Sequence, residues 1–129
     1  IKEGLIDVIV SDHLPEDEES KRLPFAQAAT GAIGVETLLP LALEMYHNES
    51  LPLDKIIETL TINPAEILQI KKGSLSKGSD GDICIFDLEA PWAVKAEDLK
   101  SNSKNTAIEG RNLQGKVLMT FLNGELVFS

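Results

Sequence analysis

The sequence predicts an α/β fold over residues 1–72, followed by a small all-β piece over residues 73–129. An apolar run at residues 5–10 is nearly continuous and rich in β-branched side chains. Such a run is typical of a strand covered on both faces, as in the parallel sheets of α/β proteins. Helical spacing of apolar residues follows it, and the pattern changes to short strands after a joint at residues 71–74.

Three helices are expected in the first part. The first spans about residues 34–47, where apolar residues recur every three or four positions, and Pro40 inside it predicts a kink or a lost hydrogen bond. The second spans residues 52–60. The third is expected to have Asn63 as its N-cap and Pro64 at its first helical position, and to end near Gln69.

The second part carries strand and turn signals. The segment ICIFDL at residues 83–88 predicts a strand, WAV at residues 92–94 predicts a shorter one, and residues 100–112 are typical of a polar loop. Asn123-Gly124 lies between two apolar runs, at residues 117–122 and 125–128. That dipeptide predicts a hairpin, because both residues of its turn must take a positive φ.

Composition narrows the class of partner. The 129 residues suit one domain, and 21 acidic against 12 basic side chains give a net charge of -9. This charge argues against a nucleic-acid backbone or an anionic membrane as the main partner. Cys84 is the only cysteine, which excludes an internal disulfide and suits a cytoplasmic location. Because the strand begins almost at Ile1, we expect the chain to be a piece of a larger domain.

Candidate chemistry lies where the first strand ends, in the stretch DVIVSDHLPEDEESK at residues 7–21. In (β/α) barrels the reactive side chains follow the carboxyl ends of strands. Asp12 there could ligate a metal or accept a proton. The alternative is that Asp12 caps a turn and His13 packs beside it. The charged loop that follows is either a solvated surface or a flap over a site.

A pair of glycines in TGAIGVET is the second candidate feature. Gly31 and Gly34 precede a predicted helix, where free N–H groups could bind an anion, although such a pair often marks only a turn. Glu36 is explained by the helix dipole. Structural or core roles are expected for His47, Cys84, Phe86 and Trp92.

The segment SDHLPEDEESKRLPFAQAATGAIGVETLLPLAL resembles the last barrel strand, loop and helix of dihydroorotases, within the amidohydrolase superfamily. That family pattern runs Asp-His-Ala-Pro-His, a charged loop with a lysine, Gly-x-x-Gly-Leu-Glu-Thr and Leu-Pro-Leu. The chain matches it at residues 12–15, Lys21, residues 31–37 and residues 39–41. The later segments TINPAEILQI, SKNTAIEG and LQGKVLMTFLNGELVF are similar to the family's tail, a looser pattern that hydantoinases and allantoinases share.

The resemblance implies that residues 1–72 are the last strand and helices of a distorted TIM (β/α)8 barrel. It implies that residues 73–129 are part of a small β-sandwich. It also implies one or two zinc ions, most of whose ligands lie elsewhere in the complete enzyme. The implied reaction is the reversible cyclisation of N-carbamoyl-L-aspartate to L-dihydroorotate in pyrimidine biosynthesis, and the 129 residues are expected to be inactive alone.

Four site residues follow from the resemblance. Asp12 matches the metal ligand that also carries a proton to and from the ring nitrogen. The backbone at Thr30 and Gly31 matches a segment that contacts the substrate. Glu16 stands where the family has a histidine that binds the substrate carboxylate. Since two carboxylates repel, Glu16 is expected to point elsewhere, or another cation takes over that role.

Other functions stay open beside this one. Glu16 motivates an inactive dihydroorotase-like scaffold for aspartate transcarbamoylase, and the shared tail motivates a hydantoinase or allantoinase. An independent binding domain would have to expose the apolar faces of residues 5–10. The expected partners are therefore a small-molecule substrate, the remainder of the same chain, a second copy in a homo-oligomer, and aspartate transcarbamoylase.

Overall fold

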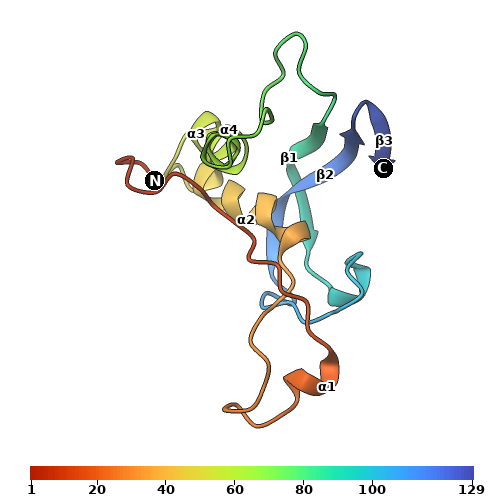
Figure 1. Cartoon of the computed structure of the whole chain (residues 1–129). Coiled ribbons are helices and arrows are strands. Elements are labelled where there is room, and N and C mark those ends of the chain that lie inside the picture. The colour runs from red at the N-terminus through yellow and green to blue at the C-terminus, as the bar shows by residue number, and fades with distance from the viewer.

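A computed structural model describes all residues, 1–129, as a group of helices beside a three-stranded sheet (Figure 1). The helices are α1 (Glu18–Lys21), α2 (Val35–His47), α3 (Leu53–Leu60) and α4 (Ile62–Ile67), and a short 3₁₀ helix, η1, spans Ala96–Asp98. The strands are β1 (Ile83–Ala93), β2 (Asn112–Leu122) and β3 (Glu125–Phe128). No helix of the structure has the length and apolar character needed to cross a membrane.

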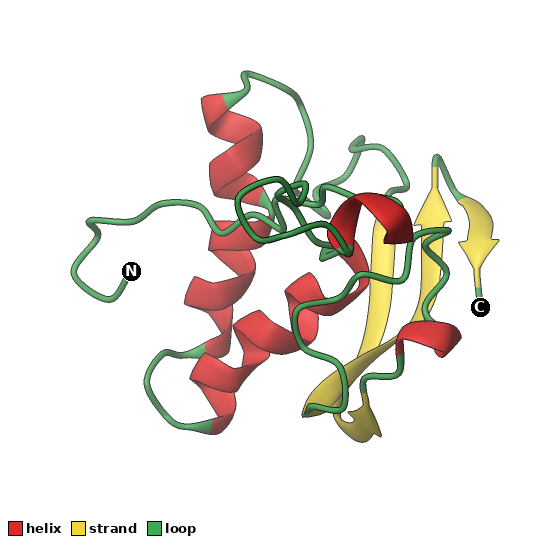
Figure 2. Ribbon diagram, turned by 90° about the horizontal axis from the view of Figure 1, so that it is seen from below, coloured by secondary structure: helices red, strands yellow, loops and turns green.

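Helix α2 lies at the centre and joins the two halves of the chain. Figure 2 shows it between the pair α3 and α4 and the sheet. Leu41 packs on an apolar cluster at the sheet side, and Ala42 belongs to a second cluster shared with α3. The predicted helix over residues 34–47 is confirmed, and it continues through Pro40, whose ring is buried. Leu43 is fully buried and meets the backbone of β2 at Gly115.

Two features of the later helices differ in outcome. The helix predicted at residues 52–60 is confirmed as α3, with Ile56 completely buried. The prediction that Asn63 caps the next helix, with Pro64 at its first helical position, is wrong, because α4 begins two residues before Pro64, at Ile62, with Thr61 as its N-cap. The Asn63 side chain instead donates from Nδ2 to the carbonyl oxygen of Asp7 at 2.8 Å. Asn63 therefore ties α4 to the extended segment at the start of the chain.

The sheet is antiparallel, in the order β1-β2-β3. The two strands predicted at residues 83–88 and 92–94 form one strand, β1, with irregular register between Asp87 and Pro91. The Asp87 carboxylate accepts the amides of Glu89 and Ala90 at 2.9 and 3.1 Å, which accounts for the irregularity. β1 carries Pro91 because proline is tolerated where a strand bulges.

The hairpin between β2 and β3 is confirmed. Asn123 and Gly124 have φ values of 51° and 82°, as the predicted turn requires. Its turn is anchored from outside, because the Asp82 carboxylate accepts the Asn123 amide at 2.8 Å. Lys72 binds Asp82 and Asp80 at 2.5 and 2.7 Å, so the joint between the two halves is tied to the hairpin.

Residues 5–10 were predicted to form a buried strand, and in this structure they do not. They run as an extended segment without strand pairing, and the exposed fractions of Leu5 and Val10 are 79% and 70%. Two hydrogen bonds hold the segment, from the Ile9 amide to the Thr59 carbonyl at 3.2 Å and from Asn63 Nδ2 to the Asp7 carbonyl at 2.8 Å. A parallel strand needs neighbours on both sides for its backbone groups, and no strand of this chain lies beside it.

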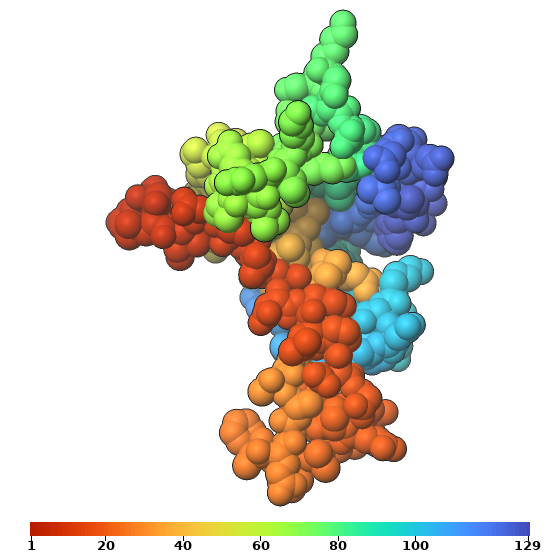
Figure 3. All heavy atoms as spheres, viewed as in Figure 1, coloured from red at the N-terminus to blue at the C-terminus, as the bar shows by residue number.

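Only 13 of the 129 residues are buried. A domain of this size that folds alone buries most of the surface of its unfolded chain. Large apolar residues remain exposed on the first segment and on the sheet, where Leu126 and Val127 are 53% and 58% exposed. In Figure 3 the loops near residues 25 and 77 also extend away from the rest of the molecule. This surface argues against the alternative of an independent binding domain.

Three residues that were expected to have structural or core roles differ in outcome. Cys84, predicted as a core residue, is exposed, and partial burial of its sulfur raises the pKa of the thiol. Trp92 is half-buried against the core, as predicted, and its indole N–H donates to the Gly115 carbonyl at 3.0 Å. His47 ends α2 as expected, and its Nδ1 lies 4.0 Å from a carboxylate oxygen of Glu89.

Candidate functional site

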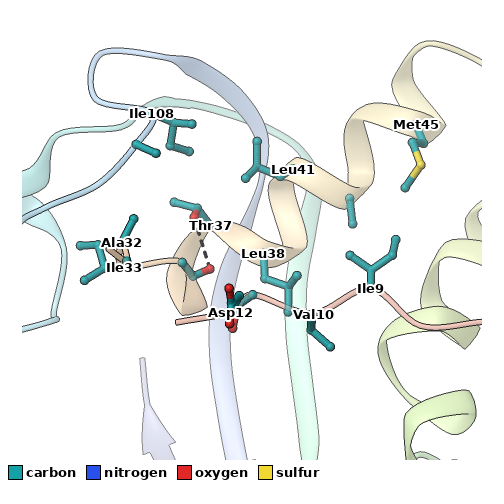
Figure 4. Close-up of a pocket in the computed structure, with 15 residues that line it drawn as sticks. Ile9, Val10, Asp12, Ala32, Ile33, Thr37, Leu38, Leu41, Met45 and Ile108 are labelled. Carbon is teal, nitrogen blue, oxygen red and sulfur yellow. Dashed lines mark hydrogen bonds between the residues drawn. The ribbon is translucent and has the colours of Figure 1, made fainter. Parts of the chain in front are cut away.

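Asp12 closes the extended segment and faces the first turns of α2. Its backbone takes a left-handed conformation, with a φ of 45°, which is uncommon for a residue other than glycine. The Asp12 side chain and the backbone of Gly31 line one open hollow of about 460 Å³, whose walls are mostly apolar. Figure 4 shows Asp12 beside Leu38 and Val10, next to the segment that carries Ala32.

His13 has a defined structural role that the sequence did not predict. Its Nδ1 accepts the amides of Gly34 and Val35 at 3.1 and 3.4 Å, so the imidazole caps the N-terminus of α2. Two of the N–H groups expected there for an anion, those of Gly34 and Val35, are therefore bonded within the chain, which favours the alternative that the glycine pair marks a turn. The cap of this turn is His13 and not Asp12, whose carboxylate accepts no hydrogen bond from the chain.

The two glycines are required by close backbone contacts. A Cβ on Gly31 would lie 2.7 Å from the carbonyl oxygen of Leu14, and Gly31 has a φ of 122°. A Cβ on Gly34 would lie 2.7 Å from the carbonyl oxygen of Ser11. The segments before and after the charged loop thus lie side by side, and the Leu14 amide donates to the Ala32 carbonyl at 3.0 Å.

The carbonyl oxygen of Gly31 accepts two side-chain hydrogen bonds. Lys21 Nζ donates to it at 2.8 Å, and to the Ala29 carbonyl at 2.7 Å. Asn105 Nδ2 donates to it at 3.1 Å from a loop 74 residues further along the chain. The charged loop, expected to be irregular, contains the one-turn helix α1, which places Lys21 beside the Gly31 peptide.

Glu16 lies on the other side of the same loop. It lines a second hollow, of about 590 Å³, which is polar and also includes Lys21 and Asn105. The backbone of Glu16 is held: its amide lies 3.5 Å from Asn105 Oδ1, and its carbonyl accepts the Ser103 hydroxyl at 2.6 Å. The structure brings Asp12 and Gly31 to one hollow and places Glu16 at another, while Thr30 is exposed and lines neither.

The rim of the polar hollow is acidic. Asp17 caps α1 by accepting the Ser20 amide at 2.8 Å, and this hydrogen bond is the main reason that the pKa of Asp17 lies below its ordinary value. Glu18 lies next to it, with its carboxylate paired to Arg22. Lys21 is the basic residue of α1 that reaches inward from this rim.

Sequence reasoning missed the contribution of residues 100–105. The Glu36 carboxylate, assigned to the helix dipole, accepts the amides of Lys100 and Ser101 at 2.9 and 3.1 Å. The Ile33 amide donates to the Asn105 carbonyl at 3.2 Å. Figure 3 shows residues near 100 packed against those near 15. Only the motif SKNTAIEG, within the polar loop, could have drawn attention to this region.

The residues of this chain do not build a metal site by themselves. No cluster of three or more His, Cys, Asp and Glu side chains is placed to hold an ion. Asp12 supplies one carboxylate, and a zinc site needs three or four protein ligands. A metal centre at Asp12 would need ligands from outside these 129 residues.

Curated relatives match the chain along its whole length. It is similar to the dihydroorotase of Ehrlichia chaffeensis, with 41% identity over 128 residues, which are 99% of this chain and 29% of that protein. It is equally similar to the dihydroorotase of Aquifex aeolicus, with 41% identity, 99% of this chain and 30% of that protein. The chain thus spans less than a third of the length of these relatives.

Solved structures share the fold. The L-hydantoinase of Arthrobacter aurescens superposes with a TM-score of 0.90 at 32% identity, over 99% of this chain and 30% of that one. The dihydropyrimidinase of Brevibacillus agri gives a TM-score of 0.93 at 23% identity, over 98% and 29% of the two chains. An inactive dihydroorotase-like domain from Chaetomium thermophilum gives a TM-score of 0.59 at 22% identity, over 74% and 25%.

The match to the family agrees with this site, in which one strand-like segment, one glycine-bearing turn and one helix meet at Asp12. The sequence model described as the amidohydrolase family matches residues 1–127. The chain belongs to the amidohydrolase family.

Proposed function

We propose that the chain is the C-terminal part of a dihydroorotase, which interconverts N-carbamoyl-L-aspartate and L-dihydroorotate. The observation that carries this proposal is Asp12, at the end of an extended segment facing the Gly31 backbone, in a chain 41% identical to dihydroorotases. Residues 1–72 would supply the last strand and helices of the (β/α)8 barrel. Residues 73–129 would supply part of the small β-sandwich.

Asp12 is the proposed acid and base. In the hydrolytic direction the oxygen of water attacks the ring carbonyl carbon and the ring C–N bond breaks. The Asp12 carboxylate takes the proton that the water loses and gives it to the departing nitrogen. In the cyclising direction the same proton travels back, so one carboxylate serves both directions.

The remaining site residues are proposed to bind the substrate. The backbone at Thr30 and Gly31 would contact the non-reacting part of the substrate through its peptide groups. Glu16 would not face the substrate carboxylate, and its position at the polar hollow, away from Asp12, supports this. Lys21 and Lys104 are the two cations that line that hollow with Glu16.

Zinc is the proposed metal, one or two ions, with Asp12 as one ligand and the other ligands outside this chain. The complete protein is proposed to act in the cytoplasm, alone or as a homo-oligomer. Association with aspartate transcarbamoylase is the proposed role if the complete protein lacks activity. One solved structure that shares this fold is described as an inactive dihydroorotase-like domain.

A different cyclic amide is the other candidate substrate. The favouring observation is the 32% identity to an L-hydantoinase across 99% of the chain. Glu16 also departs from the dihydroorotase pattern at a position that would set specificity. The reaction type and the role of Asp12 are the same for either substrate.

The test is an assay of the purified complete protein on carbamoyl-aspartate, hydantoin and allantoin. The proposal expects turnover of carbamoyl-aspartate with a kcat/KM at least about 100-fold above that for the other two, a difference near 2.7 kcal/mol. Preference for hydantoin or allantoin would move the assignment to that substrate. No turnover of any of the three would support the non-catalytic role. The 129 residues alone are expected to give no turnover.

A further inference from the structure

We propose that Asn105 is a positioning residue for substrate binding, acting with Lys21 by fixing the Gly31 peptide. The inference rests on the proposed function, because it assigns a role to the backbone that would contact the substrate. Its basis is the geometry of the Gly31 carbonyl, on which two side chains from distant parts of the chain converge.

Asn105 connects three points of the site by itself. Its Nδ2 donates to the Gly31 carbonyl at 3.1 Å, while its Oδ1 lies 3.5 Å from the Glu16 amide and next to the Ser103 hydroxyl oxygen. Its own carbonyl accepts the Ile33 amide at 3.2 Å. The Asn105 side chain therefore bridges the two ends of the charged loop, from Glu16 to Gly31. The Asn105 backbone carbonyl holds the chain at Ile33, just before α2.

Lys21 holds the same carbonyl from within the loop. Its ammonium reaches the Ala29 and Gly31 carbonyls at 2.7 and 2.8 Å, so it fixes the backbone on both sides of Thr30. Gly31 has a φ of 122°, and because glycine lacks a Cβ its backbone is less restricted than that of other residues. Two donors on the Gly31 carbonyl oxygen select a single orientation of that peptide. This orientation fixes the direction of the neighbouring peptide N–H and C=O groups.

The expected consequence is a defect in binding and not in chemistry. A loosened Gly31 peptide weakens contacts made equally in the ground state and the transition state, and such a loss raises KM while leaving kcat unchanged. Asn105 contacts neither Asp12 nor the reacting bond. A residue that only stabilised the fold would lower the amount of active enzyme and leave KM as it was.

The experiment uses the complete protein and four variants. Asn105→Ala removes the bridge, and Asn105→Asp keeps an oxygen toward Glu16 but loses the donor to Gly31. Lys21→Met removes the second donor without altering the loop at residues 100–105. Asn102→Ala is the matched control, since Asn102 lies in the same exposed loop and its side chain makes no hydrogen bond in the structure.

We expect Asn105→Ala and Lys21→Met each to raise KM about tenfold, the effect of losing one hydrogen bond of about 1.4 kcal/mol, with kcat within about twofold of wild type. Asn105→Asp should raise KM at least as much, and Asn102→Ala should match wild type. Unchanged KM in Asn105→Ala and Asn105→Asp overturns the inference, as does a fall in kcat alone.

Hydrogen exchange separates this inference from the proposed function. The amides of Leu14 and Ile33 report on the bridged backbone, and Asn105→Ala should speed their exchange about fivefold while Asn102→Ala does not. If the wild-type protein turns over none of the tested substrates, the proposed function fails and this measurement alone decides whether Asn105 holds the loop. Exchange that stays at the wild-type rate overturns the inference in that case too.

Discussion

The carboxylate of Glu36 binds the backbone amide of Lys100 at 2.9 Å, although 64 residues separate the two in the sequence. A second oxygen of the same carboxylate accepts the Ser101 amide at 3.1 Å. This contact joins the first turn of α2 to the polar loop before β2. It holds that loop against the helix whose other end packs on the sheet.

Replacing Glu36 should therefore loosen the connection between the two halves. Glu36→Ala leaves two amides without their charged acceptor and should lower the unfolding free energy of the complete protein by about 1–2 kcal/mol. Glu36→Gln keeps one good acceptor oxygen and should cost less. The measurement is urea unfolding followed by tryptophan fluorescence. Glu97→Ala, at an exposed position of η1, is the control, and an equal loss there would contradict the role of Glu36.

Gly31 offers a test of the close contact between the two loop ends. Gly31→Ala should destabilise the complete protein by about 2 kcal/mol or more, because its Cβ would strike a backbone oxygen and its φ is positive. Gly78→Ala is the control, with a φ of 92° and open space around the added Cβ. Gly78→Ala should lower the stability by less, because only its positive φ, and no steric contact, opposes the added Cβ. Equal melting temperatures for the two variants would refute the contact.

His13 tests the cap of α2. His13→Ala removes the acceptor of the Gly34 and Val35 amides and should cost about 1 kcal/mol, as losses of N-terminal caps do. His13→Asn, whose side chain can also accept at a helix start, should recover part of this loss. The thermal midpoints of the two variants, compared with wild type, measure the effect. A midpoint for His13→Ala equal to that of wild type would show that His13 does not stabilise α2 as a cap.

Acid stability should depend on the joint between the halves. The Asn123 amide, and then Lys72, lower the pKa of Asp82 below its ordinary value of 3.8. A carboxyl with a lowered folded-state pKa contributes stability that is present above the unfolded-state pKa and is lost as pH falls through the folded-state pKa. Below about pH 4, wild type should therefore lose the stability that the Asp82 carboxylate contributes. Asp82→Asn has no such carboxylate and lacks this contribution at every pH.

The measurement for Asp82 is the unfolding midpoint of wild type and Asp82→Asn between pH 3 and pH 7, in steps of about half a unit. The gap between the two proteins should be constant near neutrality and should close in acid. Asp98→Asn, at an exposed residue whose side chain makes no hydrogen bond in the structure, should follow wild type throughout. A gap that widens as pH falls would have the wrong sign for this interaction.

Local signals in the sequence predicted local structure well. Asn123-Gly124 specifies its hairpin because the required φ values exclude most other residues, and the spacing of apolar residues over 35–47 predicts α2. The prediction for Asn63 failed because its side chain binds the Asp7 carbonyl in the first segment, a contact that no local sequence pattern encodes. The prediction that Cys84 lies in the core failed because the apolar face of β1 is exposed in this chain.

Contacts between distant segments could not be predicted. Nothing near Asn105 or Glu36 in the sequence indicates that each binds backbone groups more than 60 residues away. The strand expected at residues 5–10 failed for a related reason, since a parallel strand depends on neighbours from other parts of a sheet. Asp12 was predicted as a site residue from its place after that apolar run, and in the structure it lines the hollow at the end of the extended segment.

The measurement that tests the central claim most directly is the turnover of carbamoyl-aspartate by the complete protein with Asp12→Asn. We expect a fall in kcat of about 1,000-fold or more, since the variant loses its acid and base and a proposed metal ligand. Asp7→Asn, in the same extended segment, should retain wild-type turnover. An Asp12→Asn protein within about tenfold of wild type would contradict the assignment of Asp12 to the chemistry.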